Sequence, residues 1–129
     1  MAAAFFWSPV AGLDFAQAEE KNRVFEIRTY YANEGKLDAL LARFRDHTVT
    51  LFKKHGMTNV GYWVPVDNKE NKLVYMLAFP SREARNKAFK AFSADPDWQK
   101  ARKESTKDGR LVKKIVNDFL AGTDFSKIK

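Results

Sequence analysis

The sequence predicts a small α+β domain whose strands and helices follow the order β-α-β-β-α-β. Three observations support this. A helical pattern of about five turns fills residues 36–55, strand-like runs lie on both sides of it, and a proline interrupts a second helical region. The chain has 129 residues, is 45% hydrophobic and contains no cysteine. Its length therefore suits one domain with a modest core, and disulfides and thiolate sites are excluded.

The first expected strand is a run of alternating, β-favouring residues, VFEIRTYY. Because side chains alternate along a strand, Phe25 and Ile27 share one face. Glu26, Arg28 and Tyr30 share the other. We expect the apolar pair to pack against the helices and the polar trio to face away from them.

The long helix is expected at residues 36–55, where apolar residues recur at i, i+3, i+4 and i+7. Gly56 follows directly and suits the left-handed residue that ends a helix. Two β-rich runs come next, at residues 58–66 and 72–79. The polar residues between them predict an antiparallel hairpin.

The second helical region is expected in two pieces. Ser81 is a suitable N-cap for a helix over residues 82–92. Asp95 and Pro96 repeat this signal, a cap followed by proline at the first helical position. A fourth strand is expected at residues 111–120. The resulting order of elements, β-α-β-β-α-β, is that of the ferredoxin-like sandwich built from split βαβ units. In this chain the second helix is divided in two.

The N-terminal segment, residues 1–18, differs from the rest of the chain. It is apolar, too short to span a membrane, and ends in Ala16-Gln17-Ala18, which suits cleavage by signal peptidase. No basic residue precedes the apolar part. We expect a signal peptide and a periplasmic or secreted protein. The alternative is a disordered arm on a cytoplasmic protein.

The formal net charge is +7, and residues 82–114 hold eleven Lys/Arg against five Asp/Glu. The basic residues are spread between core positions and form no continuous run, as expected for a solvated helical face. No RNA-binding aromatic motif accompanies them. A protein that binds nucleic acid or a membrane surface is therefore the least favoured of the functions considered, and no transmembrane segment is expected.

Metal binding has little support. The only histidines, His47 and His55, lie eight residues apart on the expected helix, which separates them by about 12 Å along its axis. They cannot share one metal ion. Phosphate-binding loops and hydrolase motifs are also absent from the sequence. We expect no cofactor, although either histidine alone could serve as a haem ligand.

The candidate site is centred on Glu26, Arg28 and Tyr30. A guanidinium can orient an anion with two hydrogen bonds, with a carboxylate and a phenol beside it. Trp63 is a candidate apolar wall of the same ligand site. His47 joins Arg28 as a candidate catalytic residue, since imidazole can carry protons. The alternative is structural, with Glu26 and Arg28 forming an ion pair.

A series of short motifs runs in order along the domain. They are Phe25-Glu26-Ile27-Arg28-Thr29-Tyr30, Gly35-Lys36-Leu37, Phe44 with His47-Thr48, His55-Gly56, Val60-Gly61-Tyr62-Trp63, Arg85, Asp95-Pro96-Asp97-Trp98 and Thr123-Asp124-Phe125-Ser126. Together they resemble the NIPSNAP family over residues 24–126. The chain departs from the family pattern at residues 64–66 and 77–80, so a ligand should not be transferred from one member to this chain.

The resemblance implies a dimeric α/β barrel, in which two four-stranded sheets pack face to face as a homodimer. It implies no single established reaction. We therefore expect a protein of undetermined activity that binds a small organic molecule in the barrel interior. The alternative is an enzyme of the same barrel fold, either haem-associated or like the cofactor-independent monooxygenases.

We predict that the mature protein begins at or near Glu19, because the cleavage pattern ends at Ala18. N-terminal sequencing of protein purified from its native host checks this. A cytoplasmic protein that retains residues 1–18 would contradict it.

Overall fold

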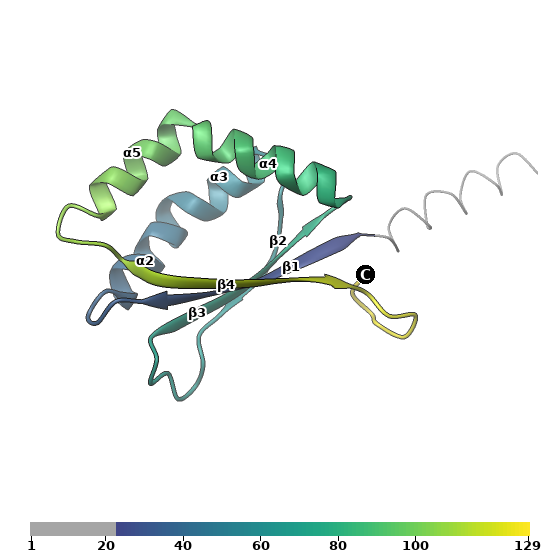
Figure 1. Cartoon of the computed structure of the whole chain (residues 1–129), viewed down its shortest axis with the longest axis horizontal. Coiled ribbons are helices and arrows are strands. Elements are labelled where there is room, and N and C mark those ends of the chain that lie inside the picture. The colour runs from purple at the N-terminus through teal and green to yellow at the C-terminus, as the bar shows by residue number, and fades with distance from the viewer. Residues whose placement is uncertain (1–22) are drawn as a thin grey trace, which may run out of the picture.

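The computed structural model describes residues 23–129. The expected signal peptide or arm, residues 1–18, lies outside this range. The described chain forms the predicted α+β, ferredoxin-like arrangement, with the second helix divided in two (Figure 1). Its elements are β1 (Val24–Ala32), α2 (Leu37–Arg43), the π-helical segment η1 (Phe44–Thr48), α3 (Val49–Lys54), β2 (Thr58–Trp63), β3 (Lys72–Phe79), α4 (Arg82–Ala94), α5 (Pro96–Ser105) and β4 (Val112–Ala121).

The four strands form one antiparallel sheet in the order β2-β3-β1-β4. All the helices lie on one face of this sheet, and the other face carries no helix (Figure 1). The β2–β3 hairpin was predicted from the polar residues between the two runs. Strand β2 ends at Trp63, earlier than expected, and the chain then enters the turn.

The predicted starts of α4 and α5 and the glycine after α3 are confirmed, whereas α4 continues to Ala94, beyond the expected residue 92. The side chain of Ser81 accepts a hydrogen bond from the backbone N–H of Ala84 and caps α4. Asp95 accepts one from Asp97 and caps α5, which has proline in its first turn. Gly56 has φ of +81°, a left-handed conformation that costs a glycine little.

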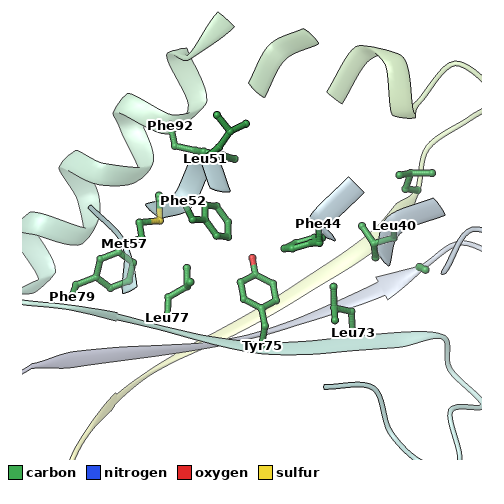
Figure 2. Packing of buried hydrophobic residues seen from close by; sticks show 12 residues of the cluster. Leu40, Phe44, Leu51, Phe52, Met57, Leu73, Tyr75, Leu77, Phe79 and Phe92 are labelled. Atoms are coloured by element: carbon green, nitrogen blue, oxygen red, sulfur yellow. The ribbon is translucent and has the colours of Figure 1, made fainter. Parts of the chain in front are cut away.

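The expected orientation of β1 is wrong. Arg28 pairs with Tyr75 in the sheet, so the two side chains share a face. Tyr75 is fully buried and points from β3 into the helix layer (Figure 2). Glu26 and Tyr30 lie on the same face as Arg28 and therefore also point toward the helices. Alternation in a strand separates two faces but does not identify the inner one, and here buried charges occupy the inner face.

Phe25 and Ile27 of β1 lie on the face without helices. Phe25 is nevertheless only 4% exposed. The Arg23 guanidinium lies 5.1 Å from its ring, and Arg23 also donates a hydrogen bond to the backbone oxygen of Lys129. Phe25 and residues of the chain after β4, among them Ile128, line a common pocket. The C-terminal segment thus lies beside this end of the open face.

The core between helices and sheet is rich in aromatic rings. Phe52 lies at its centre, 1% exposed, with ring centroids 4.8 Å from Phe92 and 6.1 Å from Tyr75. Phe44 packs from the π-helical segment against the other side of Tyr75 (Figure 2).

Within residues 23–129, no helix is both long enough and apolar enough to cross a membrane.

Candidate functional site

A cavity of about 430 Å³ lies between the helix layer and the strands β1 and β4. Every helix contributes to it, and its walls include Phe44, Phe52, Phe92 and Trp98. The exposed residues that line it come from the end of α5, the following loop and the edge strand β4. The mouth therefore opens along β4, at the edge of the sheet. A concave site of this size, with aromatic walls and a polar mouth, can enclose a small organic molecule.

Arg43 is the buried charge in this cavity. Its side chain comes from the last turn of α2, is 8% exposed, and its guanidinium lies 5.2 Å from the ring of Trp98. One terminal nitrogen donates to the hydroxyl of Ser105 at 3.2 Å. The Nε–H has no acceptor within residues 23–129. Burial lowers the pKa of Arg43, and the nearby Arg102 lowers it further against an opposite effect of Tyr30.

The charge of the cavity lining has one sign. The residues that line it include five cations and no carboxylate, the cations being Arg43, Arg102, Arg110, Lys113 and Lys114. Among the described residues, none of these five has a carboxylate oxygen within 4.0 Å. The cavity is therefore an environment that favours a negatively charged group.

Tyr30 brings a hydroxyl to the cavity wall. Arg28 donates to Tyr75 at 2.8 Å and to Tyr30 at 3.2 Å, and the two hydroxyl oxygens are 3.1 Å apart. The bond between the phenols uses one of their two hydrogens. The other has no acceptor among residues 23–129. Only Tyr30 of the pair lines the cavity, so it is the phenol that can donate to a ligand.

Glu26 is fully buried, does not line the cavity, and accepts hydrogen bonds from two arginines and an asparagine. Arg85 of α4 binds both of its oxygens at 2.9 Å, and Arg28 and Asn117 donate at 2.7 and 2.8 Å. Burial alone would raise the pKa of Glu26. The hydrogen bonds from Arg85 and Asn117, with the charge of Arg28, outweigh it and lower the pKa below the usual value. Glu26 lacks free capacity for a ligand.

The structure separates the other predicted site residues from this group. Trp63 lies on the open face of the sheet, 54% exposed, away from Glu26, Arg28 and Tyr30. His47 is exposed on the outer side of the π-helical segment and lines only shallow clefts there. Glu26, Arg28 and Tyr30 are brought together as predicted, but on the helix side of the sheet.

Neither histidine reaches the cavity. The Nε2 of His55 lies 2.7 Å from Asp95, which also accepts from Lys54 at 2.8 Å. Hydrogen bonds from Lys54 and His55 hold the pKa of Asp95 well below its usual range. This group fixes the junction between α4 and α5. Residues 23–129 contain no cluster of three His, Cys, Asp or Glu arranged to hold a metal ion.

Sequence reasoning missed Arg43 and Trp98 as residues of the cavity. Arg43 lies three residues after Leu40 and beside Phe44, within the apolar stripe of the predicted helix. A charged residue in such a stripe is a usable signal, because a buried charge needs a partner. The π-helical segment that follows Arg43 was also missed, and such segments occur frequently at functional sites.

Comparison with known proteins identifies relatives along almost the whole domain. The NIPSNAP family model matches residues 25–127. A NIPSNAP family protein of unknown function from Agrobacterium tumefaciens is 27% identical, covering 84% of this chain and 96% of its own, with a TM-score of 0.74. A NIPSNAP-like domain protein from Burkholderia xenovorans is 18% identical, covering 82% and 90%, with a TM-score of 0.72.

A more distant structure shares the fold alone. It is described as a candidate antibiotic biosynthesis monooxygenase from Nitrosomonas europaea, is 12% identical, and covers 82% of this chain and 95% of its own, with a TM-score of 0.59. No protein with a curated description matches the chain.

We predict that Glu26→Gln lowers the free energy of unfolding at neutral pH by roughly 1.5–3 kcal/mol, because charged hydrogen bonds are lost in a buried site. The folded-state pKa of Glu26 lies below the usual 4.5. Its stabilising contribution is thus complete above that pH and is lost as the pH falls through the folded-state value. Urea unfolding of both proteins should show the difference shrinking in acid. A difference independent of pH would contradict this account.

Proposed function

The chain belongs to the NIPSNAP family, and on this premise we propose that it binds a small organic molecule in the cavity between β4 and the helices. The observation that carries the proposal is the buried guanidinium of Arg43, which lines an aromatic cavity without a carboxylate partner. A buried charge without a counter-charge lowers the stability of the folded protein, which suggests that Arg43 serves a purpose other than stability. A ligand that enters the cavity would supply the missing partner.

The proposed site replaces the barrel interior as the place for the ligand. Arg28 and Tyr30, the residues that suggested the barrel interior, point to the helix side. Arg28 is engaged with Glu26 and both phenols, so it holds Tyr30 in place. Tyr30 and Arg43 are the groups left to contact a ligand.

We predict that the full chain binds anilinonaphthalenesulfonate, a fluorescent aromatic anion, at one site per subunit. Ile115→Trp should abolish binding, since Ile115 lines the cavity and is 48% exposed, so a larger ring can occupy the mouth without disturbing the core. The matched control is Val66→Trp, because Val66 is fully exposed in the β2–β3 turn. Fluorescence titration measures both. Absence of binding, or equal binding by the two variants, would overturn the proposal.

An enzymatic reaction in the same cavity is the second candidate function. The observation that favours it is the Tyr30 hydroxyl, which has a hydrogen to donate and is held by Arg28. A positioned phenol of this kind can act as a general acid. Such a reaction would use the reactivity of the substrate and no haem ligated by His47 or His55, since neither lines the cavity.

The open face of the sheet supports assembly as a homodimer. Its apolar residues include Ile27, Val74 and Met76 in the centre, with Trp63 and Val116 toward the edges, 54% and 45% exposed. The same face also carries Lys72, Lys114 and Asp118, and the apolar centre of the face favours a cover. A second copy of the chain supplies an identical apolar face, as in the face-to-face barrel that the family resemblance implied.

Export remains a prediction from residues 1–18 alone.

We predict a dimer at micromolar concentration, because pairing the two open faces buries their apolar residues. Light scattering after size exclusion should give twice the chain mass. Val74→Glu places a charge at the centre of the face and should yield a monomer, whereas Val66→Glu, on the exposed turn, should not. A monomeric unmodified protein would refute the dimer.

A further inference from the structure

The cavity has two chemically distinct parts. Its interior is aromatic and contains one buried cation, Arg43. Its rim carries the exposed cations Arg102, Arg110 and Lys113, whereas the Lys114 ammonium lies over the Tyr31 ring on the other face of the sheet. Exposed cations attract anions from solution but hold them weakly, because water and salt screen them. Selection of a ligand must therefore depend on the interior.

The interior fits a ligand with one anionic end. A single guanidinium can neutralise one carboxylate or enolate, and its planar fork suits the two oxygens of a carboxylate. Phe44, Phe52 and Phe92 surround the remaining space and offer no charge for a second anionic group. Aromatic walls of this kind favour a planar, apolar body.

Tyr30 adds a second contact of the same polarity. Tyr30 lines the same cavity as Arg43, and its ring lies 5.6 Å from that of Phe44, the residue after Arg43. Its hydroxyl accepts from Tyr75 and has a hydrogen without an acceptor among residues 23–129. The oxygen of the Tyr30 hydroxyl already accepts a hydrogen bond from an N–H of Arg28. The hydroxyl is thus left as a donor, and a donor beside a cation favours an anionic oxygen over a neutral or basic group.

We propose that the ligand is a planar aromatic or enolic monocarboxylate, whose carboxylate is bound by Arg43 with the Tyr30 hydroxyl beside it. This inference rests on the proposed function, since it assigns a ligand class to the same cavity. Arg43 is then a binding residue whose cost in the empty protein is offset when the ligand enters. Arg43 differs in this from Arg85, whose guanidinium donates to both carboxylate oxygens of Glu26 and is neutralised by them.

The test compares naphthoate with naphthamide, which have the same ring system and differ in charge, by isothermal titration calorimetry on the full chain. The unmodified protein should prefer naphthoate by roughly tenfold to a hundredfold, the range expected for a charged hydrogen bond. Arg43→Met should remove this preference by weakening naphthoate alone. Arg45→Met is the matched control, because Arg45 is exposed two residues along and lines none of the cavity. The control should keep the preference.

Thermal melting separates a binding role from a structural one. If Arg43 serves the ligand, Arg43→Met should melt at the same temperature as the unmodified protein or higher, because an unpaired buried charge is removed. Arg43→Lys keeps the charge and should retain part of the preference, which guards against a misfolded methionine variant. A marked fall in melting temperature with unchanged naphthoate affinity would make Arg43 structural and overturn the inference.

The outcomes also separate this inference from the proposed function. Equal affinity for naphthoate and naphthamide, with anilinonaphthalenesulfonate still displaced from the cavity, would leave a small-molecule site but refute its preference for anions. A preference for naphthoate that survives in Arg43→Met would refute Arg43 as the anchor. Failure of anilinonaphthalenesulfonate to bind at all would refute the proposed function itself.

Discussion

The buried carboxylate of Glu26 is the constraint on which the interior of the domain depends. It accepts hydrogen bonds from β1, β4 and α4 at once, through Arg28, Asn117 and Arg85. A carboxylate without exposure to water must be neutralised, and these donors do so while tying three elements together. Arg28 then extends the network to Tyr75 and Tyr30. Arg28 thus links the two roles: it neutralises Glu26 and, through a second hydrogen bond, holds the Tyr30 hydroxyl at the cavity wall.

The two buried arginines on the helix side of the sheet, Arg28 of β1 and Arg43 of α2, differ in their partners. Arg28 is paired with Glu26 and stacked 4.9 Å from Phe89. Arg43 is stacked on Trp98 and has only the Ser105 hydroxyl as a hydrogen-bond acceptor among the described residues. Proteins commonly accept a local cost in stability where a site must bind something else. The unequal treatment of the two guanidiniums is what distinguishes a structural network from a candidate site.

The sheet presents different chemistry on its two faces. The helix side holds the charged network, the aromatic core and the cavity, and the open side is apolar around Ile27, Val74 and Met76. The cavity opens along β4, whose residues are mostly exposed. A partner bound to the open face would therefore leave the entrance to the cavity, at the β4 edge of the sheet, uncovered. The proposed dimer interface and the proposed ligand site therefore lie on separate surfaces of one four-stranded sheet.

The sequence by itself determined the order of the strands and helices and several of their ends, but neither the early end of β2 nor the π-helical segment. Helical periodicity, Ser81, Asp95 and Gly56 are local signals, and each depends on neighbours in the chain. It also grouped Glu26, Arg28 and Tyr30 on one strand face. Only the tertiary structure decided that this face is the inner one, because the partners that make burial tolerable, Arg85 and Asn117, lie 59 and 91 residues from Glu26. The cavity and the isolation of Arg43 likewise depend on α5 and β4, which no local pattern on α2 could reveal.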